Sequence, residues 1–340
     1  MKQMTRRERI AATLERQPVD RVPYAFWRHF PRVDRNPAAL AQTTLRFQER
    51  YGNDFLKLTP SGGYAVEAWG CVEGEDERPD GHRPCVACAV RDADDWKKIR
   101  PLDPGASPGY VDQIETIVRM GFDKRIGDAP VLPTLFSPLS LARKLSGARL
   151  DTDLRERPAA VRDALEAITE TLIRFAALAL DEGVSGIFYS IQAASRALHA
   201  EDQYAEFGEP YDRRVLESVA GRSILTLIHC HGAGLMFERL ATLPGHAWNW
   251  DDRATPPSLD GGQRLVPGAV VGGLHQWMTL RDGTPDSAVA EAKDAIARTG
   301  GVGLIVGAGC VLPNETPDAN VAAVVRALGG PLKPIPGVAT

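Results

Sequence analysis

Short apolar runs alternate with longer amphipathic stretches along most of the chain. Most of the runs are continuously apolar rather than alternating, which is the pattern of strands covered on both faces. They predict eight strands: Val22–Trp27, Asp54–Leu58, Val131–Phe136, Val184–Tyr189, Ile224–Ile228, Ala247–Trp250, Ala269–Gly273 and Gly303–Val306.

Apolar residues at helical spacing fill much of the sequence around these runs. The predicted helices are Thr5–Leu14, Ala159–Leu180, Pro210–Gly221, Gly234–Ala241, Ser287–Thr299 and Asn320–Leu328. Eight strands with helices between them predict an α/β fold, a (β/α)8 TIM barrel, in preference to an open doubly wound sheet. No Gly-x-Gly-x-x-Gly turn follows the first strand, which disfavours a dinucleotide-binding fold.

The stretch Gly63–Pro108 departs from this alternation. A polar run follows Cys71, then come Cys85 and Cys88 in an apolar context and the acidic segment Arg91–Trp96. We interpret it as a hairpin-like insertion at the rim. No repeat or linker divides the chain, so we expect a single domain over residues 1–340 with an irregular insertion around 63–108.

Composition excludes some classes of function. Net charge is -4 over 340 residues, without the basic excess typical of nucleic-acid binding. The start of the chain has no apolar leader, and no apolar run is long enough for a transmembrane helix. Five cysteines are an odd number and do not form a disulfide framework. We expect a cytoplasmic protein that acts on a small molecule, with no nucleic-acid or membrane partner.

Polar side chains gather where the predicted strands end. In (β/α)8 barrels, catalytic groups come from these ends and meet at one mouth. Arg28 and His29 follow the first strand and are expected to bind an anionic substrate group. Gln276, just beyond another strand, is a third candidate substrate-binding residue. A solvated loop explains Arg28 equally well.

The sharpest cluster is His229-Cys230-His231 with the distant Cys310. Alternating side chains let His229 and His231 point the same way while Cys230 turns aside. Two imidazoles and a thiolate suit zinc, and three protein ligands leave a fourth position open for chemistry. From the residues alone, two hydrogen-bonded histidines and a buried cysteine explain the pattern equally well.

Two further strand-end residues are candidate catalytic groups. Asp251 is placed to orient a ligating histidine, although a helix N-cap is an equal alternative. His275 is a candidate for proton transfer or substrate binding, and a surface histidine is at least as consistent with the sequence.

Cys85-x-x-Cys88 is a competing metal candidate. A structural zinc site needs four ligands, and no second pair lies nearby in the sequence. The apolar neighbours Val86 and Ala87 favour a strand, so we interpret both cysteines as packing residues outside the site.

The order of motifs resembles the uroporphyrinogen decarboxylase superfamily, and within it the zinc-dependent, corrinoid-linked methyltransferase branch. The segment Arg7–Leu14 is similar to the family's opening, and residues 18–23 match its Pro-x-Asp-Arg-Val-Pro entry to the first strand. Residues 307–313, Gly-Ala-Gly-Cys-Val-Leu-Pro, are the strongest match. The resemblance covers nearly the whole chain.

The resemblance implies a metal site. The branch has His-x-Cys-Gly plus a later Gly-Cys, which places His229, Gly232 and Cys310 on matching positions. His231 stands where that branch has cysteine. A neutral imidazole in place of a thiolate makes such a site less negative and a bound zinc a stronger Lewis acid, which affects acceptor preference.

The decarboxylase branch matches less well. Its Arg-Gln-Ala-Gly-Arg run corresponds to residues 28–32, where Arg28 and Arg32 are present but the residues between differ. That reaction needs no metal, so it leaves the His229, His231 and Cys310 cluster without a role.

The hypothesis is therefore a zinc-dependent methyltransferase. It moves a methyl group between a corrinoid carrier, methylcobalamin on a partner protein, and a small acceptor such as a thiol. The alternatives are a metal-free, uroporphyrinogen decarboxylase-like carboxy-lyase and a catalytically inert barrel that binds a ligand.

Overall fold

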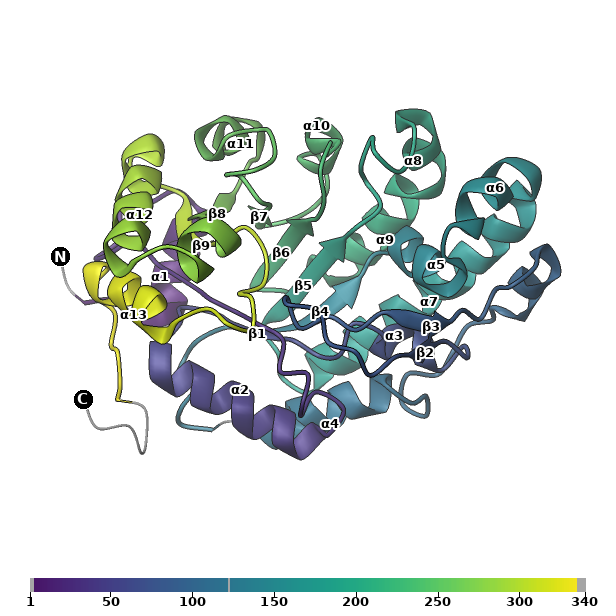
Figure 1. The fold of residues 1–340 in the computed structure, drawn as a ribbon, viewed down its shortest axis with the longest axis horizontal. Helices are drawn as coiled ribbons and strands as arrows, with labels where there is room; N and C mark the ends of the chain where they lie inside the picture. Colours follow the sequence, from purple (N-terminus) through teal and green to yellow (C-terminus); the bar gives the residue numbers. More distant parts are fainter. Residues whose placement is uncertain (1–2, 122, 335–340) are drawn as a thin grey trace.

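Seven parallel strands form one curled sheet (Figure 1). The computed structural model describes residues 3–121 and 123–334. The sheet order is β1-β4-β5-β6-β7-β8-β9, so neighbours in the sheet follow each other along the chain. The strands are β1 (Leu56–Leu58), β4 (Val131–Phe136), β5 (Gly186–Ile191), β6 (Leu225–Cys230), β7 (Ala247–Asn249), β8 (Ala269–Leu274) and β9 (Leu304–Ala308). The fold is of the α/β, TIM-barrel class, as predicted.

The structure corrects one of the predicted strands, Val22–Trp27. In the part of the chain that the structure describes it forms no regular strand, but it lies extended between β9 and β1. Tyr24 bridges Val306 on one side, and its carbonyl accepts from Asp54 N at 2.9 Å on the other. The Ala25 amide donates to the Val306 carbonyl at 3.0 Å, but the Phe26 amide donates to the Asn53 side chain at 3.0 Å, so a side chain takes a place in the ladder.

Helices pack on the outside of the sheet. They are α1 (Arg6–Leu14), α2 (Pro37–Tyr51), α4 (Tyr110–Met120), α5 (Pro138–Ser146), α6 (Arg149–Glu156), α7 (Pro158–Asp181), α8 (Glu201–Phe207), α9 (Glu209–Val219), α10 (Phe237–Leu240), α11 (Leu259–Leu265), α12 (Pro285–Thr299) and α13 (Asp318–Ala327). Local chemistry begins several of them. Thr5 and Glu8 form a capping box on α1, and prolines occupy the first turn of α2, α5, α7 and α12.

Two apolar clusters fill the molecule. One lies within the curl of the sheet and includes Trp27, Phe55, Leu132 and Phe188. The other lies between the sheet and the surrounding helices. Ile10 of α1 packs into the inner cluster, and Arg9 binds Asp54 just before β1. Helix α1 therefore closes the end where strands begin, which leaves the carboxyl ends for a site.

The stretch 63–108 holds α3 (Tyr64–Glu67), the antiparallel hairpin β2 (Val72–Glu73) and β3 (Cys85–Ala87), and the 3-10 helix η1 (Ala93–Lys98). That the whole chain is one domain stays a prediction, and residues 1–2, 122 and 335–340 of it lie outside the described residues. Among the helices that are described, none combines the length and apolar character needed to cross a membrane.

Candidate metal centre

Three potential metal ligands meet at the carboxyl ends of β6 and β9. His229 is on β6, His231 follows β6, and Cys310 follows β9. The Cys310 sulfur is 3.7 Å from His229 Nε2 and 3.7 Å from His231 Nδ1. All three ligand atoms lie within 4.8 Å of one another. The structure therefore brings together the two rings and the sulfur that the sequence analysis paired.

Strand alternation and two glycines build this arrangement. Cys230, between the two histidines, is 1% exposed and packs in the apolar cluster between the sheet and the helices. Because successive side chains of a strand point to opposite faces, the two histidines face the mouth instead. Gly232 has φ +103°, a conformation that favours glycine, and turns the chain directly after His231. A Cβ on Gly309 would lie 2.5 Å from Asp251 Cα, so only glycine lets the loop carry Cys310 this close.

Asn249 on β7 fixes the orientation of the His229 ring. Its side-chain oxygen lies 2.6 Å from His229 Nδ1. Its amide nitrogen donates to the carbonyls of Val271 at 2.8 Å and Ala308 at 3.0 Å, which sets which way the amide faces. Nδ1 of His229 therefore keeps its proton, and Nε2, the ring nitrogen that is free to bind a metal or a proton, faces Cys310.

The electrostatics of the three groups favour a thiolate. Burial by itself raises the pKa of Cys310, but the charge and hydrogen bonds of His229 and His231 hold that pKa well below its usual value. The hydrogen bond that the His231 ring donates to the Cys310 thiolate in turn raises the pKa of His231. A thiolate with two imidazoles is a donor set that zinc accepts, and one coordination position would stay open.

A cavity of about 290 Å³ opens in front of these ligands. Trp27 and Phe188 are among its apolar walls, and His29 is among its polar ones. His29 Nδ1 lies 3.2 Å from the Pro60 carbonyl. Burial, aided by the charge of Lys57, lowers the pKa of His29 to about 3, so its ring is neutral. Of the three predicted substrate-binding residues, His29 is the one that lines this cavity.

Arg28 and Gln276 lie outside the cavity lining. Arg28 donates to the Asn314 carbonyl at 2.7 Å, and its Nε is buried without a partner. Burial lowers the pKa of Arg28. Gln276 donates to Asp251 Oδ2 at 2.7 Å. Their binding of substrate stays a prediction.

The two predicted catalytic residues have other contacts. Asp251 accepts a hydrogen bond from Gln276 and contacts Gly309, the residue before Cys310. The residue that contacts Nδ1 of the His229 ring is Asn249. His275 Nδ1 accepts from the amides of Trp277 at 3.1 Å and Met278 at 3.2 Å, and so caps the π-helix η2 (Gln276–Arg281). A catalytic role for either stays a prediction.

Lys57 is a cavity residue that the sequence analysis missed. Its ammonium lies 3.2 Å from Thr59 Oγ1 and 4.5 Å from the Phe188 ring centre, and no carboxylate of the described residues pairs with it. Burial lowers its pKa to about 7, against the charge of Cys310, which raises it. The sequence signal that could have revealed it is a lysine within the apolar run before Thr59. The sequence analysis also missed Asn249, which is a polar residue between two tryptophans.

Comparison with known proteins places this chain in a family. The uroporphyrinogen decarboxylase (URO-D) model matches residues 5–330. The chain belongs to the uroporphyrinogen decarboxylase family. Its relatives include the methylcobamide:CoM methyltransferase MtbA of Methanosarcina mazei, 23% identical over 96% of this chain and 98% of that protein. A uroporphyrinogen decarboxylase of Anaeromyxobacter dehalogenans is 26% identical over 94% of this chain and 97% of that protein.

A solved structure has the same fold. The structure of a methyltransferase from Methanosarcina mazei superposes with a TM-score of 0.84, at 22% identity, over 96% of this chain and 99% of that one. Relatives of this chain therefore include proteins named as a methyltransferase and as a decarboxylase, at 23% and 26% identity, and similarity alone does not choose between the two reactions.

Proposed function

We propose that the protein is a zinc-dependent methyltransferase, which moves a methyl group between a corrinoid carrier and a small acceptor such as a thiol. His229, His231 and Cys310 would hold the zinc. The observation that carries the proposal is the convergence of their ligand atoms within 4.8 Å, with His229 Nε2 left free by Asn249. A metal-free decarboxylase has no use for this arrangement.

The residues around the ligands suit transfer to an anionic acceptor. Zinc bound here would supply Lewis acidity, which favours the thiolate form of a thiol at neutral pH. Lys57 presents an ammonium ion to the same cavity, pairs with no carboxylate of residues 3–121 and 123–334, and would stabilise that negative charge. Trp27 and Phe188 would exclude water from it.

The remaining predicted residues are assigned positions around this centre. Asp251 and Gln276 each keep one buried oxygen without a partner, close to the loop of Cys310, and we assign them to positioning that loop. Arg28 and His275 would act at the outer edge of the substrate site. The methyl donor would be methylcobalamin on a corrinoid protein, which the similarity to a methylcobamide:CoM methyltransferase supports.

The test is methyl transfer by zinc-loaded protein under anaerobic conditions. Methylcobalamin is mixed with a panel of small thiols, and its loss is followed by absorbance while methylated thiol is detected by mass spectrometry. We expect transfer by the wild type, loss of at least 100-fold in Cys310→Ala, and retained zinc with altered thiol preference in His231→Cys. Unchanged rates in Cys310→Ala would refute the proposal.

A second candidate is a uroporphyrinogen decarboxylase-like activity, favoured by the 26% identical decarboxylase and by Arg28 and Arg32 in the position of that branch's arginines. It predicts release of carbon dioxide from a carboxylated tetrapyrrole by protein stripped of metal. Carbon dioxide release that is unaffected by Cys310→Ala would favour this candidate.

A further inference from the structure

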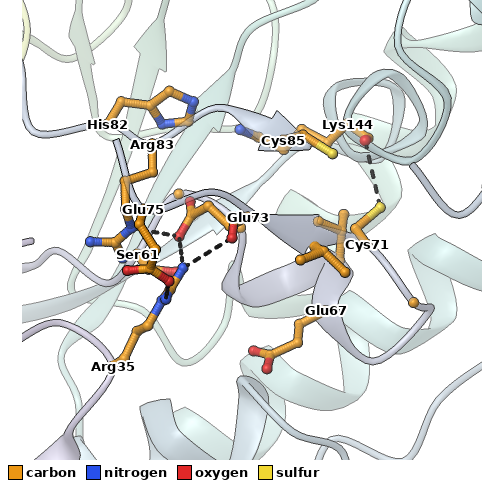
Figure 2. Close-up of a pocket in the computed structure, with 15 residues that line it drawn as sticks. Arg35, Ser61, Glu67, Cys71, Glu73, Glu75, His82, Arg83, Cys85 and Lys144 are labelled. Carbon is orange, nitrogen blue, oxygen red and sulfur yellow. Dashed lines mark hydrogen bonds and ion pairs between the residues drawn. The ribbon is translucent and has the colours of Figure 1, made fainter. Parts of the chain in front are cut away.

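A second cavity, of about 530 Å³, adjoins the cavity in front of His229, His231 and Cys310 (the metal cavity), and Figure 2 shows residues that line the second cavity. His82 and Lys144 line both cavities, so the two share a wall. Cys71 and Cys85 line the second cavity only, on the side where the hairpin β2–β3 meets the end of α5. Neither cysteine has a part in the proposed methyl transfer.

Cys85 and Cys88 are in direct contact. Their sulfur atoms lie 3.7 Å apart. In a straight strand, residues three apart lie about 10 Å from each other and point to opposite faces. Here β3 ends at Ala87, and the Cys85 thiol donates to the Ala87 carbonyl at 3.3 Å. The turn after β3 therefore brings the two sulfurs together.

The two thiols are accessible to solvent. Cys85 is exposed and Cys88 is half-buried, so the interpretation of Cys85 as a packing residue is wrong. Cys71, the nearest other cysteine, is only 6% exposed and donates to the Lys144 carbonyl at 3.7 Å. Burial raises the pKa of Cys71 to about 12, which keeps it a thiol at neutral pH. The reactive pair is thus Cys85 with Cys88.

A metal site fits these residues less well than sulfur chemistry does. A closed zinc site needs four ligands. Within residues 3–121 and 123–334, His229, His231 and Cys310 form the one group of three or more His, Cys, Asp or Glu side chains with metal-ligand spacing. Cys85 and Cys88 therefore supply two ligands and no more.

We infer that Cys85 and Cys88 form a reversible dithiol–disulfide site that exchanges with low-molecular-weight disulfides. The thiolate of Cys85 attacks one sulfur of the small disulfide, which forms a mixed disulfide and releases one small thiolate. Cys88 then loses its proton and attacks the Cys85 sulfur, which closes the protein disulfide and releases the second thiolate. The small disulfide gains two electrons, and the protein loses two.

The cysteine pair lies where the hairpin β2–β3 contacts α5, a helix that also lines the metal cavity. Val90, two residues after Cys88, donates to the Leu145 carbonyl at 2.9 Å and so attaches the hairpin to α5. Lys144 on that helix places its ammonium 4.7 Å from the Phe136 ring centre, in the wall shared with the metal cavity. Oxidation would therefore form a covalent link beside a residue of the metal cavity.

The experiment uses the full-length, zinc-loaded protein. It is equilibrated with mixtures of reduced and oxidised glutathione at neutral pH, alkylated with N-ethylmaleimide and mapped by peptide mass spectrometry. We expect the peptide with Cys85 and Cys88 to pass from doubly alkylated to unalkylated with the loss of two hydrogens. Cys85→Ser and Cys88→Ser should each stop at a mixed disulfide with glutathione. The matched control Cys71→Ser should close the pair as the wild type does.

Three results would overturn the inference. The pair could stay alkylated in mixtures that fully oxidise dithiothreitol, or Cys85 could pair with Cys71 instead. A second zinc per chain, lost in Cys85→Ser and in Cys88→Ser alike, would make the pair a metal ligand set. None of these readouts depends on methyl transfer, so the inference and the proposed function succeed or fail separately.

Discussion

Asn249 determines which nitrogen of His229 can bind a metal. Its amide is held by two backbone carbonyls, so its oxygen must face the imidazole. Such a contact orients a ligand and increases its basicity without touching the metal.

Replacing Asn249 with alanine is therefore expected to weaken zinc binding by about 10- to 100-fold while leaving all three ligands in place. Competition with a chromophoric chelator measures the change. Asn36→Ala is the control, because Asn36 caps α2 away from the site. An affinity for zinc that Asn249→Ala leaves intact would mean that the ring is oriented by other contacts.

Lys57 is a buried charge that no carboxylate in the described part of the chain pairs with, and such a charge costs stability. Its pKa falls from 10.5 when exposed to about 7 in the fold because of burial. Between these two pH values the unfolded chain holds more protons, so this group makes the folded state more stable as pH rises and least stable below about pH 7.

Lys57→Met should accordingly raise the free energy of unfolding of the metal-free protein by up to about 4 kcal/mol at neutral pH. The variant should also flatten the rise of stability between neutral and alkaline pH. Chemical denaturation across that range measures both effects. The exposed Lys97→Met is the control and should change stability by about 0.5 kcal/mol or less. A destabilised Lys57→Met would contradict the assignment of Lys57 as a costly, functional charge.

The sequence predicted the ligands of the candidate site better than their surroundings. His229 and His231 were visible because strand alternation and a following glycine mark a strand end, and Cys310 because it follows a glycine-rich turn. Lys57 and Asn249 were hidden because each stands within an apolar run, where a polar side chain gives no sign of which face it takes. The contact of His275 depends on a π-helix, for which the sequence has no clear signature.

Among the elements, the strands were predicted more accurately than the closure of the sheet. The bounds of β4 match the predicted Val131–Phe136, and β5 begins two residues after its predicted start. The segment Val22–Trp27 has the composition of a strand, but two of its amides donate to the side chains of Asp54 and Asn53, and these hydrogen bonds replace part of its ladder. Long-range contacts of this kind leave no local pattern.

The extended segment Val22–Trp27 and helix α1 are held at the start of the sheet by Asp54. This fully buried carboxylate accepts from Arg9 at 2.7 Å, from Arg21 at 2.8 Å and from the Tyr24 amide at 2.9 Å. Helix α1, the extended segment and the start of β1 therefore meet at one side chain.

Asp54→Asn should lower the free energy of unfolding by about 3–5 kcal/mol, because two guanidinium groups lose their buried partner. Urea denaturation measures the loss. Glu75→Gln removes a comparable ion pair with Arg35, but that carboxylate is 86% exposed, so about 1 kcal/mol or less is expected. Equal effects of the two substitutions would show that α1 is not needed to close the sheet.

At the scale of the whole molecule, the curled parallel sheet explains why distant residues share one site. His229 and Cys310 are separated by 81 positions, yet β6 and β9 both end at the same mouth. The chain has relatives that are named for different reactions, so the fold alone does not select one. Under the proposed function, the ligand set at the mouth is what would select methyl transfer.

The zinc content of protein purified without chelators tests the central claim most directly. We expect about one zinc ion per chain in the wild type, in Cys85→Ser and in Cys88→Ser, and almost none in His231→Ala or Cys310→Ala. Circular dichroism establishes that each variant is folded. A folded wild-type protein that binds no zinc when supplied with it, or a Cys310→Ala variant that binds zinc as tightly as the wild type, would contradict the account.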